Sequence, residues 1–238
     1  MIRFLVSILV FVIDVLYKNR PYPRFYVLET VARVPYFSYL SVLHLYETLG
    51  LWRKSDWLKV HFAETWNELH HLLIMESLGG NDRWYDRLLA KSSALVYYWV
   101  IVVLYMISPR SAYEFMRQVE EHAFHTYDEF LKSDGERLKL QPAPVVAVSY
   151  YLTGDLYMFD EFQTSRRPEE RRPACDTLYD VFVNIRDDEA EHVKTMAACK
   201  AENAQLTFKS PHSALPEAKS EPPIAAPQPR ATGRGALE

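Results

Sequence analysis

Two segments of the chain carry a glutamate and a histidine three residues apart. The first pair is Glu68 with His71, and the second is Glu189 with His192. On a helix, positions i and i+3 share one face, so each carboxylate and its imidazole converge on one point. One such pair is common by chance. Two in one chain predict a metal site of the four-helix type, in which two further helices each add one glutamate.

Glu29 and Glu120 are the candidates for these two glutamates. Helical neighbours of Glu29 are mostly apolar, and a carboxylate among apolar groups is costly unless it is paired or bound to metal. Glu120 shares a helical face with Met116 and Tyr127, whereas its neighbour Glu121 lies on a polar face. The periodicity therefore favours Glu120, although by itself it is equally consistent with a residue on the helix surface.

The donor set indicates which metal to expect. Carboxylate oxygens combined with two imidazoles suit iron or manganese, whereas zinc usually has fewer carboxylate ligands. The two cysteines, Cys175 and Cys199, are too few for a Cys₄ site or a disulfide framework. The candidate ligands are Glu29, Glu68, His71, Glu120, Glu189 and His192.

Long segments with little proline and glycine can supply the helices that hold these residues. We expect helices at 25–48, 57–78, 84–107, 111–132, 143–162 and 176–203. The predicted fold is all-α, a ferritin-like four-helix bundle that forms a single domain over residues 1–208. A Pro/Ala-rich tail at 209–238 has no aromatic residues or periodicity and is expected to be disordered.

Two apolar runs, at 4–13 and 94–107, suggest contact with a membrane. Each is shorter than the roughly 20 apolar residues of a spanning helix, and aromatic residues make up 14% of the chain. We therefore expect monotopic binding to one leaflet through short apolar helices, the first of them at the N-terminus. The alternative is that both runs are buried core helices. A net charge of −4 argues against general nucleic-acid binding.

Several motifs together resemble the alternative oxidase family. They are RFYVLET at 24–30, FAETWNELHHLLIME at 62–76, LGGN at 78–81, HAF and TYD within 122–128, and RDDEAEH at 186–192. The resemblance covers about residues 20–203. Within the family, the stretch GDLYMFDEFQTSR at 154–166 resembles the branch of plastid terminal oxidases and their cyanobacterial relatives.

The resemblance implies that the six candidate ligands hold two iron ions. It also implies supporting catalytic roles beside the centre for Asn67, Tyr127 and Asp188, of which Asp188 could fix the tautomer of a ligand imidazole. It places Arg24, Leu28 and Thr126 at a quinol pocket. Position 122 is histidine where the mitochondrial branch has glutamate, so the role of His122 at the quinol pocket stays open. We interpret His70 as structural or adjacent to the site, and His44, His61 and His125 as structural.

The implied activity is that of a quinol:oxygen oxidoreductase that reduces O₂ to water, insensitive to cyanide and without proton pumping. The donor would be plastoquinol or another membrane quinol. The location would be a thylakoid or other plastid membrane, or the corresponding cyanobacterial membrane, and the protein would be a homo-oligomer. Two alternatives stay open: a di-iron quinone-ring hydroxylase, and a non-catalytic helical protein of the membrane surface.

Overall fold

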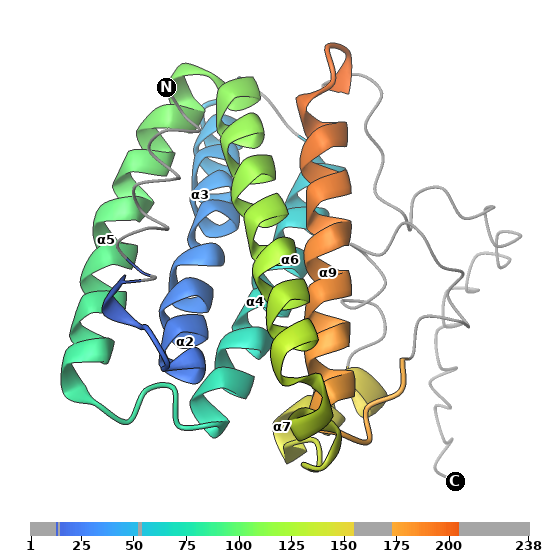
Figure 1. Ribbon diagram of the computed structural model, residues 1–238. Helices are drawn as coiled ribbons and strands as arrows, with labels where there is room; N and C mark the ends of the chain where they lie inside the picture. Colours follow the sequence, from blue (N-terminus) through green and yellow to red (C-terminus); the bar gives the residue numbers. More distant parts are fainter. Residues whose placement is uncertain (1–12, 14, 52–53, 155–172, 205–238) are drawn as a thin grey trace, which may run out of the picture.

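The computed structural model describes residues 13, 15–51, 54–154 and 173–204, and these are almost entirely helical. The long helices α4 (Ser55–Ser77), α5 (Trp84–Ile107), α6 (Pro109–Lys139) and α9 (Leu178–Lys200) run along one another (Figure 1). Among the described residues, the one β feature is an isolated bridge between Pro142 and Thr177. The prediction of an all-α bundle is confirmed.

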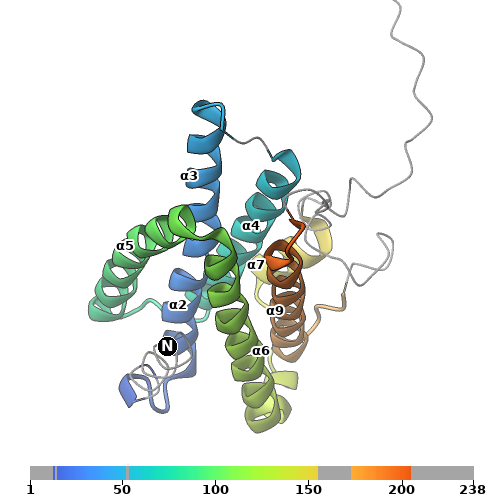
Figure 2. The same ribbon diagram turned by 90° about the horizontal axis from the view of Figure 1, so that it is seen from above.

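Four helices surround a common interior. Viewed from above in Figure 2, α2 (Pro21–Ala32), α4, α6 and α9 form a ring, while α5 lies outside it beside α2 and α3 (Val34–Thr48). Helix α6 packs along α9, and α2 packs against both α4 and α5. The short helix α7 (Val145–Val148) and the π-helical turn η1 (Ser149–Thr153) follow α6, and α7 contacts α4.

The helix expected at 25–48 is two helices, so that expectation was wrong. The break falls at Arg33, and Pro35 lies in the first turn of α3. Proline has no N–H to donate to the preceding turn, and its ring restricts the residue before it. Arg33 itself keeps a nearly helical backbone, so α3 begins directly where α2 ends.

Helix α6 is longer than the expected 111–132. It begins after Ser108, whose side chain accepts a hydrogen bond from the Ser111 N–H, and it continues through Gly135 to Lys139. Glycine is unfavourable inside a helix, but here α9 approaches closely: a Cβ at Gly135 would lie 3.1 Å from the Tyr179 ring. Tertiary packing therefore overrides the local signal. At the start of α9, Thr177 and Asp180 form a capping box.

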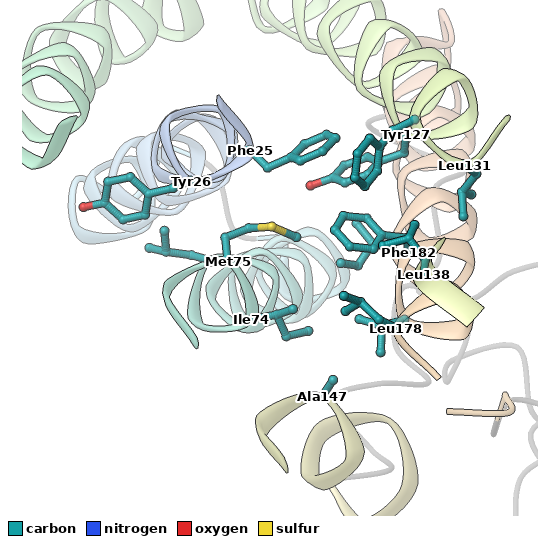
Figure 3. Packing of buried hydrophobic residues seen from close by; sticks show 14 of the residues in the cluster. Phe25, Tyr26, Ile74, Met75, Tyr127, Leu131, Leu138, Ala147, Leu178 and Phe182 are labelled. Carbon is teal, nitrogen blue, oxygen red and sulfur yellow. The ribbon is translucent and has the colours of Figure 1, made fainter. Parts of the chain in front are cut away.

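Two apolar clusters lie at different heights along the bundle. The first contains the stacked rings of Phe25 and Tyr127, 4.4 Å apart, with Phe182 against both (Figure 3). The second contains Tyr36, Tyr39, Trp57, Tyr105 and Tyr113. On α6 and α9, the candidate ligands lie in sequence between the residues that each helix gives to the two clusters. On α4 they lie between Trp57 of the second cluster and Leu72 of the first. The chemistry-bearing layer is thus enclosed by apolar side chains on both sides.

Helix α5 presents a largely apolar face to the outside. Its exposed side chains include Leu95, Val96, Trp99, Val100 and Val103. Its length and composition, with a mean hydropathy of 1.7 over the best window, would suffice for crossing a membrane, and 22% of that window is buried. The N-terminal run at 4–13, except Ile13, the stretch at 155–172 and the tail at 209–238 lie outside the described residues.

The C-terminus of α4 gives a direct test of the fold. Gly79, with φ of +80°, and Gly80 close a Schellman motif, in which their N–H groups donate to Glu76 O and Met75 O. A Cβ at Gly80 would lie 2.8 Å from Met75 O and from Tyr22 O. Because both obstacles are backbone atoms, we expect Gly80→Ala to destabilise the protein by about 1–3 kcal/mol, measured by thermal unfolding.

Gly135→Ala is the matched control. There the nearest atom belongs to the edge of a side-chain ring, and alanine gains up to about 1 kcal/mol of helix propensity. It should change the unfolding temperature little. A Gly80→Ala protein as stable as the Gly135→Ala protein would contradict the close approach of α2 to the end of α4.

Candidate metal centre

All six candidate ligands meet in the interior of the four-helix ring. Glu29 comes from α2, Glu68 and His71 from α4, Glu120 from α6, and Glu189 and His192 from α9. None of them is more than 2% exposed. The spacing that led to the two Glu-x-x-His pairs places both on inward faces, and of the pair at 120–121 the structure turns Glu120 inward and leaves Glu121 exposed.

The ligand atoms form two overlapping groups. One consists of Glu29, Glu68, His71 and Glu189, and the other of Glu68, Glu120, Glu189 and His192. Within each group the donor atoms lie within 4.8 Å of one another. Glu68 and Glu189 belong to both groups. This is the arrangement expected of two adjacent metal ions that share two bridging carboxylates.

The imidazoles face the carboxylates through Nδ1. His71 Nδ1 lies 3.4 Å from Glu189 Oε1 and 3.6 Å from Glu29 Oε2. His192 Nδ1 lies 2.9 Å from Glu68 Oε1 and 3.6 Å from Glu189 Oε2. His71 therefore directs Nδ1 between the shared Glu189 and Glu29 of its own group, whereas His192 directs Nδ1 between the two shared carboxylates.

The polar atoms of the centre fit a metal better than they fit one another. Among the described residues, both carboxylate oxygens of Glu68 and Glu189 are buried without a hydrogen-bond partner, as are Glu29 Oε2, Glu120 Oε2 and His71 Nδ1. Buried polar groups left unpaired are rare and costly. Four carboxylates and two imidazoles form a set of oxygen and nitrogen donors that suits iron or manganese.

Burial and the neighbouring charges shift the pKa values of the candidate ligands. Desolvation, with the charge of Glu189 adding to it, raises the pKa of Glu68 and of Glu120 well above the usual range. Burial opposes charge on both histidines, but their carboxylate partners outweigh it. Asp188 and Glu189 raise the pKa of His71 well above its usual value. Glu189 and Glu68 do the same for His192. Burial also opposes charge on Glu189, but its contacts with His192 and His71 outweigh burial and lower its pKa. A metal ion must therefore displace protons here, so binding should strengthen as pH rises.

A polar network holds the outer nitrogen of His71. Asp188 Oδ2 lies 3.1 Å from His71 Nε2 and accepts hydrogen bonds from Asn67 Nδ2 at 2.9 Å and from the Tyr151 hydroxyl at 2.9 Å. Asn67 also donates to the Tyr150 hydroxyl. With a carboxylate accepting at Nε2, the tautomer of His71 that leaves Nδ1 as a donor atom for metal is favoured.

Two tyrosines hold the carboxylates that the groups do not share. The Tyr127 hydroxyl donates to Glu29, and the Tyr36 hydroxyl donates to Glu120 Oε1 at 2.5 Å. Both tyrosines are buried. Tyr127 was singled out from the sequence, whereas Tyr36 was given no role there.

The residues assigned to a quinol pocket are less enclosed, apart from Thr126. Arg24 and Leu28 are half-buried on α2, and Thr126 is buried on α6. The Thr126 hydroxyl lies 3.3 Å from His122 Nε2. The structure thus places Thr126 beside the position where the mitochondrial branch has glutamate, next to Tyr127.

Sequence reasoning missed several residues around the centre. Tyr150 and Tyr151 lie on a π-helical turn, for which no periodic signal exists. His70 faces outward, stacked on Tyr150 at 4.2 Å, and its partial burial lowers its pKa. His61 was interpreted as structural, but the structure places it in a buried polar chain with Glu64 and Tyr113. The glutamate at position 64, three after His61, was the available signal.

A bundle in which four helices bring two Glu-x-x-His pairs and two further glutamates to one buried point defines a di-metal carboxylate protein. Comparison with known proteins agrees: the family model of the alternative oxidases matches residues 1–201. The chain belongs to the alternative oxidase family.

Several curated relatives are plant proteins. The chain is 60% identical over 218 residues to "Ubiquinol oxidase 4, chloroplastic/chromoplastic" of Arabidopsis thaliana, covering 92% of this chain and 61% of the relative. It is 34% identical to "Ubiquinol oxidase, mitochondrial" of Mangifera indica and 33% identical to "Ubiquinol oxidase 2, mitochondrial" of Glycine max. Each of those matches covers 75% of this chain and about half of the relative. The chain thus spans between half and three fifths of the length of these relatives.

Substitution of the two neighbouring glutamates of α6 tests the assignment of the metal ligands. Glu120 points into it, whereas Glu121 is exposed and pairs with Arg117 at 3.2 Å. We expect Glu120→Ala to abolish iron binding, because it removes a carboxylate from one of the two groups. Glu121→Ala should leave iron binding unchanged, since an exposed ion pair contributes about 1 kcal/mol or less. Iron per folded chain is the measurement, and full iron in the Glu120→Ala protein would contradict the assignment.

Proposed function

We propose that the chain oxidises a membrane quinol and reduces O₂ to water at two iron ions held by Glu29, Glu68, His71, Glu120, Glu189 and His192. The observation that carries this proposal is the pair of overlapping donor groups that share Glu68 and Glu189. When bound, the iron ions supply the redox chemistry, taking up electrons and passing them to O₂. Two quinols supply the four electrons and four protons that turn one O₂ into two waters.

Residues around the centre keep this geometry fixed. Asp188, held by Asn67 and Tyr151, orients the His71 ring. Tyr127 and Tyr36 hold Glu29 and Glu120 by hydrogen bonds from their hydroxyls. Because these partners are buried and rigid, the ligands need little reorganisation when the charge of the centre changes.

The quinol would enter beside α2 and α6. Arg24 and Leu28 provide a charged group and an apolar surface on α2, and the Thr126 hydroxyl on α6 can hydrogen-bond a quinol oxygen. Thr126 precedes Tyr127, which contacts the ligand Glu29. A quinol head group bound to Thr126 would therefore lie next to Tyr127, whose hydroxyl is hydrogen-bonded to the candidate ligand Glu29.

The membrane is the source of such a donor, since a long-tailed quinol stays in lipid. The exposed apolar face of α5 is suited to lie in one leaflet, because the opposite side of this helix packs against α2, α3 and α6. The name of the chloroplastic relative supports a plastid location and a quinol donor. Plastoquinol or another membrane quinol is the donor that we propose. The proposal that the protein is a homo-oligomer rests on the family resemblance.

Oxygen uptake tests the proposed function. Iron-loaded protein in detergent should consume O₂ with decyl-plastoquinol as donor, using half as many O₂ molecules as quinols. Cyanide should not inhibit it, and the quinone produced should be unmodified. A hydroxylated quinone would instead show a ring hydroxylase, and an iron-loaded protein with no uptake from any quinol would contradict the proposal.

The α5 face gives a separate prediction. Val96→Asp with Val103→Asp replaces two exposed apolar side chains of α5. Each substitution removes about 1–2 kcal/mol of the free energy gained when the valine side chain moves from water into lipid. Binding to liposomes, measured by co-sedimentation, should therefore weaken at least roughly tenfold. Leu140→Asp is the control, since Leu140 is equally apolar and 86% exposed but lies just beyond α6. Equal binding by both variants would rule out α5 as the membrane face.

A further inference from the structure

A second chain of buried polar groups lies beside the metal centre. Glu64 Oε2 is 2.9 Å from His61 Nδ1 on the same helix, α4. His61 Nε2 is 2.8 Å from the Tyr113 hydroxyl on α6, which is 2.8 Å from the Tyr105 hydroxyl on α5. All four side chains are fully buried. None of them belongs to either donor group of the metal centre.

This polar chain begins one helical turn from a shared ligand. Glu64 and Glu68 are four residues apart on α4, so their Cβ atoms are on the order of 6 Å apart on one face. The Tyr36 ring lies between the two assemblies, with its centroid 6.2 Å from that of His61 and 5.4 Å from that of His192. A single bridging water could close the span between the two carboxylates.

The hydrogen bonds of the polar chain leave one atom without a partner. If His61 is neutral with its proton on Nδ1, it donates to Glu64, accepts from Tyr113, and Tyr113 accepts from Tyr105. Every group is then satisfied except Glu64 Oε1, which is buried and has no hydrogen-bond partner among the described residues. Leaving such an atom unpaired costs free energy, and the cost is larger for a charged group than for a neutral one. Glu64 Oε1 is therefore the atom at which a proton can be held.

The side chains around Glu64 and His61 form an environment that disfavours negative charge. The titratable groups around the pair are Tyr36 and Tyr39 from α3, Glu68 on α4, Tyr105 from α5, Tyr113 and Glu120 from α6, and Cys199 from α9. Burial, and then the charge of Glu64, raise the pKa of Cys199 well above its usual value. Burial likewise raises the pKa of Tyr113. Added negative charge in this region therefore calls for an added proton.

We propose that Glu64 and His61 form a buried proton store for the metal centre, with Glu64 Oε1 taking up a proton as electrons enter and releasing it as O₂ becomes water. The inference rests on the proposed function. Each quinol gives up two electrons and two protons, and four of each are consumed with one O₂. The store holds one of these protons in between, so the overall stoichiometry is unchanged. Glu64 and His61 contact no substrate and act as positioning residues for this proton.

Proton uptake on reduction is the direct test. Iron-loaded protein is reduced anaerobically with reduced methyl viologen, which carries no exchangeable protons, and the pH change is followed with an indicator dye. We expect Glu64→Gln to take up about one proton fewer per iron pair than the unchanged protein, since the amide cannot hold it. Glu114→Gln is the matched control on α6, where Glu114 pairs with Arg117 and Lys200 away from the centre. It should take up the same number as the unchanged protein.

Turnover provides a second measurement. Glu64→Gln should lower kcat for quinol oxidation by about a hundredfold with KM unchanged, and Glu64→Asp should restore part of it. Tyr113→Phe, which removes a hydroxyl of the polar chain, should lower kcat and alter the solvent isotope effect. Tyr39→Phe is its control, because the Tyr39 hydroxyl donates to Ala112 O outside the polar chain. It should leave both quantities unchanged.

The outcomes separate the store from the proposed function. Iron-loaded Glu64→Gln protein with unchanged proton uptake would overturn the store. If Glu64→Gln loses its iron, an iron-loaded Tyr113→Phe protein with unchanged kcat and isotope effect would overturn it instead. If the unchanged protein oxidises no quinol, the proposed function fails, while proton uptake on reduction still reports on Glu64.

Discussion

The crowding of four buried carboxylates around one point is the constraint on which the rest of this structure depends. Glu29, Glu68, Glu120 and Glu189 would repel one another and lose their hydration without a compensating positive charge. Two imidazoles supply part of that charge. Bound cations would supply the remainder, and Glu68 and Glu189, which belong to both donor groups, would hold two such ions in common. The bundle therefore encloses a negative charge that its own side chains do not balance.

The remaining architecture keeps that arrangement in place. One apolar cluster lies on each side of the ligand layer, so the helices are fixed by packing rather than by the polar groups themselves. Hydroxyls of Tyr36 and Tyr127 then orient two carboxylates, and Asp188 orients His71. The polar chain from Glu64 to Tyr105 extends the buried polar layer from α4 across to α5. One side of helix α5 thus contributes Tyr105 to this polar chain, while its other side is apolar and exposed.

The helical fold and the six inward residues could be predicted from the sequence because both follow from short-range periodicity. Glu68 with His71, and Glu189 with His192, share a face by spacing alone. The break at Arg33 was missed because a single proline in a first turn is compatible with both one helix and two. Helix α6 was drawn too short because the packing of Gly135 on Tyr179 is a long-range contact. Tyr150, Tyr151 and the His61 partner Tyr113 were missed for the same reason, because their contacts form only after folding. Glu64, three residues after His61, was the one partner that the spacing could have shown.

X-ray absorption at the iron edge, combined with an iron count, tests the central claim most directly. The account predicts two iron ions per chain, about 3–4 Å apart, with oxygen and nitrogen ligands and no sulfur. Cys175 and Cys199 are outside both donor groups, so a sulfur ligand would contradict the site. A single iron per chain with no metal–metal distance would contradict the sharing of Glu68 and Glu189, and with it the interpretation of the bundle as a di-iron protein.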